Sequence, residues 1–107
     1  PPAEPTPLVR SRRVGRLRVH ALEAGVQRLD GGAMFGVVPR PLWERKLAPD
    51  ARNRILLAMR CLLIEHDAGV VLVDTGLGNK EAPRFHEIYG VENAGADGRT
   101  RLEDALV

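Results

Sequence analysis

Asp74 is the residue of this chain with the strongest positional argument for chemistry. It ends the apolar run 70–74 and is followed by Thr75-Gly76-Leu77-Gly78. A strand that delivers a carboxylate to a glycine-containing loop at its own end is typical of the start of an active site in sheet enzymes. Such a carboxylate can accept hydrogen bonds from the N–H groups of the loop or orient a metal-bound histidine supplied from elsewhere. It can equally be a turn aspartate with a purely structural role.

The other residues with catalytic or ligating side chains do not form a recognisable site. The three histidines, His20, His66 and His86, are separated by 46 and 20 residues, so no two of them have the spacing of a local metal-ligand pair. Neither a nucleophile-elbow motif nor a phosphate-binding P-loop motif is present. The sequence therefore predicts no catalytic residue and no metal ligand in this chain.

The single cysteine, Cys61, also argues for structure rather than reactivity. It lies in an apolar run, which favours a buried, unreactive thiol, and one cysteine makes no internal disulfide. Cys61 and His66 are five residues apart in one predicted strand, so we expect them on opposite faces, where they cannot act as nucleophile and base.

Two apolar runs must position Asp74. Residues 55–65 and 70–74 are rich in leucine and β-branched residues, and Asp67-Ala68-Gly69 predicts a hairpin turn between them. Runs so continuously apolar imply burial on both faces of a sheet. Since the chain has little material to cover both faces, we expect it to expose these apolar faces in solution and to associate.

The remaining elements are shorter. Alternation over 16–24 predicts a strand that ends at Gly25. The glycine-rich stretch 29–36 is predicted to be a loop whose Met34 and Phe35 either plug the core or lie at a pocket rim.

Three short helices are also expected. Residues 41–47 and 81–89 fit single short helices. Thr100 with Glu103 forms a capping-box pattern that opens a third helix near the end of the sequence.

Composition limits the domain organisation and the partners. The 107 residues are 44% apolar, enough for one small domain, here predicted as a flexible Pro/Arg-rich leader over 1–15 followed by a domain segment over 16–107. Residues 1–20 hold five arginines against Glu4, a charge of +4, and the rest of the chain sums to −2. Without interleaved aromatic residues, this basic end predicts no nucleic-acid partner. No apolar run has the length of a transmembrane helix, and the location is left open between cytoplasmic and exported.

The hairpin and its aspartate resemble the opening of the metallo-β-lactamase superfamily, whose first motif is an aspartate at the end of a strand. Residues 29–36 resemble the lactonase-like branch in particular. The resemblance covers residues 16–107 and includes residues 62–65, Gly69, residues 71–78, residues 37–39, Leu42, Trp43, Asn53 and Arg60.

The resemblance implies an α+β fold, the N-terminal part of an αββα sandwich made mostly of antiparallel strands with short helices. It implies metal-assisted hydrolysis of a lactone or another ester or amide, through one or two zinc ions and a metal-bound hydroxide. The histidine-rich ligand motif of the family is not in this sequence. The expected partners are therefore the rest of the same polypeptide or a complementing fragment, with a small-molecule substrate for the whole protein, and this chain alone is expected to be inactive.

Within that resemblance, Asp74 with Thr75 and Gly76 would brace the metal-binding loop, and Met34 and Phe35 would border the substrate pocket. Two alternatives stay open. One is a small β-rich binding module whose arginine-rich end engages an acidic partner, and the other is a metal-free scaffold member of the superfamily.

Overall fold

The computed structural model describes residues 8–107. The chain forms two compact units, and each is treated by itself. The first comprises residues 8–25, Met59–Lys80 and Asn93–Val107, and the second comprises Val26–Ala58 and Glu81–Glu92.

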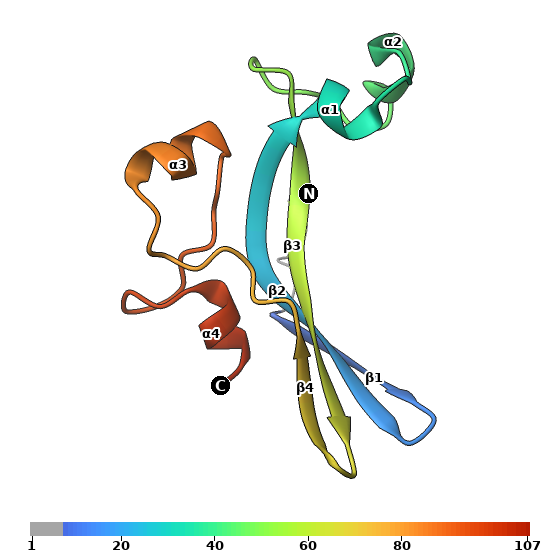
Figure 1. Ribbon diagram of the computed structural model, residues 1–107, viewed down its shortest axis with the longest axis vertical. Helices are drawn as coiled ribbons and strands as arrows, with labels where there is room; N and C mark the ends of the chain where they lie inside the picture. Colours follow the sequence, from blue (N-terminus) through green and yellow to red (C-terminus); the bar gives the residue numbers. More distant parts are fainter. Residues whose placement is uncertain (1–7) are drawn as a thin grey trace, which may run out of the picture. The chain divides into compact units, whose positions relative to one another are not determined.

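The strands form one four-stranded antiparallel sheet in the order β1-β2-β3-β4 (Figure 1). The described chain is therefore α+β with mostly strands, as the resemblance implies. The elements are β1 (Val9–Val14), β2 (Leu17–Asp30), α1 (Gly31–Phe35), α2 (Arg40–Trp43), β3 (Arg54–His66), β4 (Gly69–Val73), α3 (Pro83–Ile88) and α4 (Arg101–Ala105).

The β3–β4 hairpin forms as its sequence predicts. His66 pairs with Gly69, so Asp67 and Ala68 make a two-residue turn, the length at which antiparallel strands connect most directly. All five residues of β4 are exposed, Val70 at 62% and Val71 at 55%. The predicted exposure of the two apolar runs is thus found on β4, whereas Ile55, Met59 and Cys61 of β3 are buried.

A second hairpin, β1–β2, lies in the part of the chain where composition predicts a leader. Val14 pairs with Leu17 around Gly15, whose φ of 59° is a left-handed conformation that glycine adopts without strain. Val9–Val14 is therefore a paired strand instead of an unstructured lead-in. The prediction for residues 1–7 lies outside the described residues.

Strand β2 continues past Gly25, which was wrongly predicted to end it. Gly25 has a φ of 114°, and the strand runs on to Asp30. The backbone of the next residue, Val26, donates to and accepts from Glu92 at 2.9 Å, a bridge that keeps the segment extended. This pairing joins residues far apart in sequence, so local alternation did not reveal it.

Residues 29–36 were predicted as a loop, but they contain the short helix α1. The Asp30 carboxylate accepts a hydrogen bond from the N–H of Ala33 at 2.9 Å and so caps the helix. A Cβ at position 31 would lie 2.3 Å from the Trp43 ring, so Gly31 allows close packing against that ring. The helix forms because the cap and this contact outweigh the low helix propensity of its glycines.

The later helices start where the sequence predicts a start, within two residues. Thr100 and Glu103 form both hydrogen bonds of a capping box, as expected, and α4 follows. Helix α3 is shorter than 81–89 and α2 shorter than 41–47. None of the helices within residues 8–107 combines the length and the apolar character needed to cross a membrane.

Candidate functional site

Asp74 follows β4 directly and organises the turn after it. Its Oδ1 accepts hydrogen bonds from the N–H of Thr75 at 2.6 Å and of Gly76 at 3.0 Å. Asp74 itself has a φ of 71°, a conformation that aspartate tolerates because its short side chain bonds locally. The three residues singled out in the sequence thus form one turn, in which the carboxylate accepts from the loop's N–H groups.

The loop that follows Asp74 is held from two sides by later residues. The side-chain amide of the buried Asn93 donates to the carbonyl of Gly78 at 2.6 Å, and Asn79 donates to the carbonyl of Gly98 at 2.9 Å. The sequence analysis gave Asn93 and Asn79 no role in the site, because nothing in their spacing indicates that residues 93–98 contact this loop. The geometry around Asp74 therefore depends on a distant part of the chain.

Cys61 lies on β3 with about 1% of its surface exposed, which confirms the predicted burial. Burial raises the pKa of its thiol, and the negative charge of Asp74 raises it further. The thiol is therefore protonated at neutral pH, the unreactive form. His66 is engaged at the other end of β3, where its Nδ1 accepts from the N–H of Ala68 at 3.1 Å.

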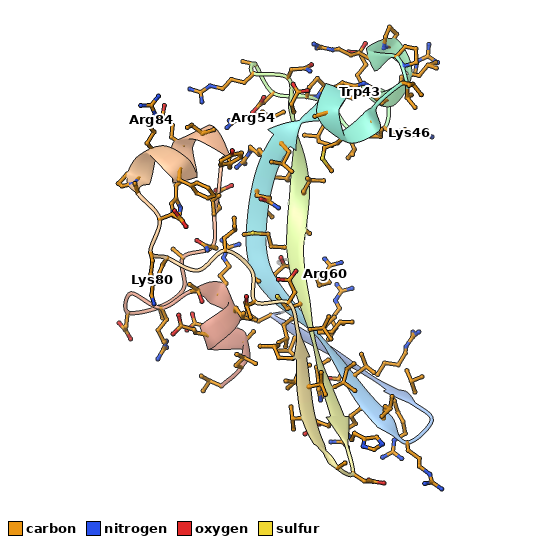
Figure 2. All side chains as sticks on the ribbon, in the orientation of Figure 1. Trp43, Lys46, Arg54, Arg60, Lys80 and Arg84 are labelled. Atoms are coloured by element: carbon orange, nitrogen blue, oxygen red, sulfur yellow. The ribbon has the colours of Figure 1, made fainter. Side chains whose placement is uncertain are left out.

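Met34 and Phe35 belong to the second unit and differ in environment. The Phe35 ring stacks on Trp43, with a centroid separation of 5.2 Å and an interplanar angle of 10°. Met34 is half exposed at the end of α1. Trp43 itself is buried beside that helix (Figure 2). Phe35 thus fits the packing interpretation, and Met34 keeps the exposure that a pocket-rim residue needs.

A polar cluster supports the helix that carries these two residues. Asn53 donates to Asp30 Oδ1 at 3.1 Å, and Arg40 donates to the Asn53 side-chain oxygen at 2.8 Å. The N–H of Ala33 and the amide of Asn53 together hold the pKa of Asp30 below its usual value. The ionised Asp30 therefore fixes the start of α1.

A third cluster was not predicted at all. Ser11 Oγ lies 2.6 Å from His20 Nδ1, and His20 Nε2 lies 2.8 Å from Glu65 Oε2, which links side chains of β1, β2 and β3. The hydrogen bond from His20 is the main cause that lowers the pKa of Glu65. The sequence analysis treated His20 as isolated because it did not foresee β1. Pairing about Gly15 was the available signal, since it sets Ser11 opposite His20.

None of these clusters is a metal site. Within residues 8–107, no three histidine, cysteine, aspartate or glutamate side chains are close enough together to hold an ion. The described residues therefore do not fit a bound metal by themselves.

Comparison with known proteins gives one informative likeness. No protein-family model matches the chain, and no curated protein matches it. A solved structure of a probable metal-dependent hydrolase from Staphylococcus aureus is similar, with 32% sequence identity and a TM-score of 0.75. The likeness covers 89% of this chain but 33% of the hydrolase chain. This likeness supports a general hydrolase interpretation, and the chain spans about a third of the length of that hydrolase.

Proposed function

We propose that this chain is the N-terminal portion of a metal-dependent hydrolase of the metallo-β-lactamase superfamily, with an αββα sandwich completed by polypeptide outside these residues. The observation that carries the proposal is the 32% identity to the staphylococcal hydrolase over 89% of this chain, at a TM-score of 0.75. Because the chain matches 33% of that protein, the larger share of such an enzyme would lie elsewhere.

The turn at Asp74 supports this proposal with a specific geometry. Oδ1 is occupied by the N–H groups of Thr75 and Gly76, and among residues 8–107 no donor reaches Oδ2. A carboxylate fixed in this way can orient a ligating histidine through its second oxygen. We assign Asp74, Thr75 and Gly76 the role of bracing a metal-binding loop. Met34 would border the substrate pocket directly, and Phe35 would border it while its ring stays packed on Trp43.

The ligands and the substrate belong to the same proposal. One or two zinc ions would be held by the rest of the polypeptide or by a complementing fragment, and would supply a hydroxide nucleophile at neutral pH. The substrate would be a small molecule with a lactone or another ester or amide bond. The alternatives are a binding module without catalysis and a metal-free scaffold of the same superfamily.

The test uses the polypeptide encoded by the complete gene, purified without chelator. We expect zinc at one or two equivalents by elemental analysis, and hydrolysis of a panel of lactones, esters and amides that a chelator abolishes. Metal without hydrolysis of any panel member would contradict the assigned chemistry. The absence of stoichiometric zinc, iron or manganese would favour the scaffold or the binding module.

The role of Asp74 is tested in the same polypeptide with Asp74→Asn and a matched control, Asp97→Asn. Both aspartates are exposed and have a positive φ, 71° and 53°, which asparagine also tolerates, so each substitution removes a charge without backbone strain. We expect Asp74→Asn to lower zinc affinity or kcat/KM about 10- to 100-fold, the usual effect of losing a carboxylate that orients a ligand. Equal effects of the two substitutions would exclude the proposed role.

A further inference from the structure

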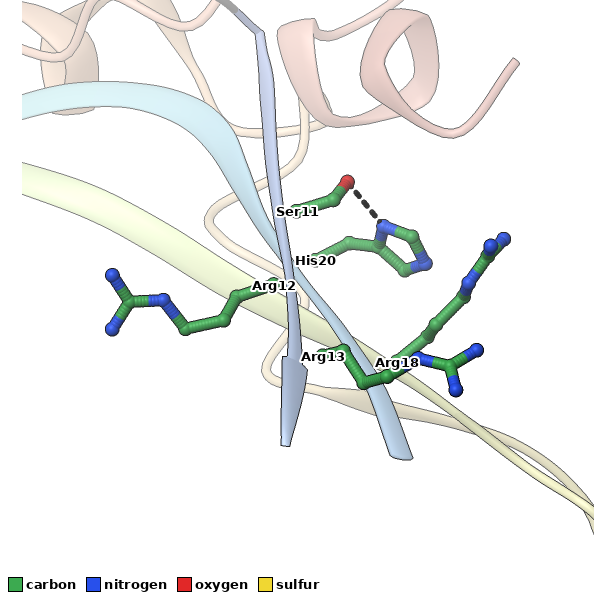
Figure 3. A pocket seen from close by; sticks show the side chains of 5 residues that line it. All are labelled: Ser11, Arg12, Arg13, Arg18 and His20. Carbon is green, nitrogen blue, oxygen red and sulfur yellow. Dashed lines mark hydrogen bonds between the residues drawn. The ribbon is translucent and has the colours of Figure 1, made fainter. Parts of the chain in front are cut away.

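Basic and hydroxyl side chains of the β1–β2 hairpin gather around an open pocket of about 360 Å³. Its lining residues are Ser11, Arg12, Arg13, Arg18 and His20, and Ser11 and His20 point toward each other within it (Figure 3). The pocket lies entirely in the first unit.

The strand register explains why these side chains meet. Ser11 is the cross-strand partner of His20, and two residues along, Arg13 is the partner of Arg18. Side chains alternate between the two faces of a strand, so both pairs lie on the same face. The hairpin thus sets two arginines at directly opposite positions, beside a serine and a histidine.

Two like charges at directly opposite positions destabilise a sheet unless something neutralises them. Within residues 8–107, neither Arg13 nor Arg18 forms an ion pair, and the nearby Glu65 is bonded to His20 through Oε2. The charge of Arg18 still contributes to lowering the pKa of Glu65. This arginine pair therefore offers a full set of donors to an anion from solution.

The hydrogen bonds that link Ser11, His20 and Glu65 determine whether the Ser11 hydroxyl can donate to a ligand. When the imidazole is neutral, Nε2–H donates to Glu65 and Nδ1 accepts the hydroxyl proton of Ser11. When the imidazole is protonated, both ring nitrogens donate, and the Ser11 hydroxyl proton is free to point into the pocket. Protonation of His20 thus adds a positive charge and an O–H donor at once. The charged or titratable groups that face it are Glu65, Arg13 and Arg18.

We propose that this pocket binds the phosphate group of a small phosphorylated molecule between Arg13 and Arg18, with the Ser11 hydroxyl as an additional donor when the His20 imidazole is protonated. Two planar guanidinium groups and a hydroxyl match the three terminal oxygens and double charge of a phosphate monoester better than the two oxygens of a carboxylate. The volume leaves room for an organic group attached to the phosphate. This assignment does not depend on the proposed hydrolase activity.

A neighbouring pocket argues against a long polyanion such as a nucleic acid. It has a volume of about 240 Å³ and shares Arg13 and Arg18, but Glu65 and Asp67 also line it. A continuous phosphate backbone that crossed both pockets would meet these carboxylates, whereas no carboxylate lines the first pocket.

The test is a titration of the chain with inorganic phosphate and with phenyl phosphate at low chloride, followed by calorimetry and by amide NMR shifts. We expect saturable binding, with the largest shifts at Ser11, Arg13, Arg18 and His20. Arg13→Gln and Arg18→Gln should each weaken binding about tenfold or more, since each removes charge-assisted hydrogen bonds. The matched control is Arg10→Gln, which removes the same charge from the same strand at a position opposite Ala21 and outside the pocket. It should change affinity less than about twofold, because an exposed charge outside the site is screened.

Several results would overturn the proposal. Equal losses in all three variants would indicate diffuse attraction and no site. Binding only to vesicles that contain phosphatidic acid, or only to single-stranded DNA, would assign the surface to a membrane or a nucleic acid. Circular dichroism checks folding, and Arg18→Lys, which keeps the charge but loses the planar fork, should still weaken phenyl phosphate binding measurably. Full affinity in Arg18→Lys would contradict the assigned geometry.

Discussion

The two hairpins of the sheet have similar backbones and opposite surfaces. Each turns in two residues, Gly15-Arg16 in β1–β2 and Asp67-Ala68 in β3–β4, and each exposes most of one strand. β1 reads VRSRRV and exposes cationic side chains, whereas β4 reads GVVLV and exposes aliphatic ones.

This difference separates a surface suited to solutes from a surface suited to burial. Exposed arginines stay hydrated until an anion replaces the water, so β1–β2 can face solvent permanently. Large contiguous patches of exposed valine and leucine are rare on monomeric soluble proteins and mark interaction sites or aggregation-prone surfaces. The contrast supports a small charged ligand for the first hairpin and a protein contact for the second.

The largest expected effect is on the free energy of unfolding, which should depend strongly on a buried side chain of the first hairpin and weakly on an exposed one of the second. Leu22 of β2 is about 1% exposed, so Leu22→Ala should lower the free energy of unfolding by about 2–5 kcal/mol, from lost burial and a residual cavity. Leu72 of β4 is 38% exposed, and Leu72→Ala should cost less than about 1 kcal/mol. Urea denaturation of both variants measures the difference. Similar costs would show that β4 is already covered in solution.

The second prediction concerns association through the apolar hairpin. Val71 is 55% exposed on the edge strand β4, and Val71→Lys should weaken self-association about tenfold, because a lysine on an edge strand opposes pairing with another chain. Val14→Lys is the control: Val14 is similarly exposed, at 54%, on the other edge strand, β1, whose arginines already oppose pairing with another chain. Sedimentation velocity over a concentration series should show a shift for the first variant alone. A monomeric wild-type chain at every concentration would remove the contrast between the hairpins.

The smallest effect is expected at the bond that joins the two hairpins, between His20 and Glu65. The pKa of Glu65 is lowered below 4.5, chiefly by this bond. Its stabilising contribution is therefore present above pH 4.5 and is lost as the pH falls through the lowered value. Thermal melts of the wild type and Glu65→Gln should differ slightly near neutral pH and converge in acid. Glu81→Gln, at an exposed position, should leave the melting temperature unchanged at each pH.

Local signals explain most of what the sequence predicted correctly. The Asp67-Ala68-Gly69 turn and the Thr100 capping box depend on residues adjacent in sequence, and both form as expected. The turn at Asp74 is local in the same way, because the carboxylate that accepts and the N–H groups that donate belong to consecutive residues.

What the sequence did not predict depends on contacts between distant residues. Strand β1 was missed because its arginines and the nearby prolines hide a pairing that Gly15 makes possible. The Ser11–His20–Glu65 chain depends on that pairing and on a third strand. Helix α1 was taken for a loop because its glycines lower helix propensity, while its contact with Trp43 is tertiary.

The two asparagine hydrogen bonds that hold the loop after Asp74 limit where this chain can be divided. The Asn93 side chain donates to the Gly78 carbonyl, and the Asn79 side chain donates to the Gly98 carbonyl. The shape of the loop therefore depends on Asn93 and Gly98, which come much later in the sequence. If the chain is cut between Lys80 and Asn93, the N-terminal piece keeps Asp74 but loses both hydrogen bonds. Chimeras and split reporters built on this scaffold should therefore be divided beyond Gly98, so that the piece with the loop keeps both hydrogen bonds.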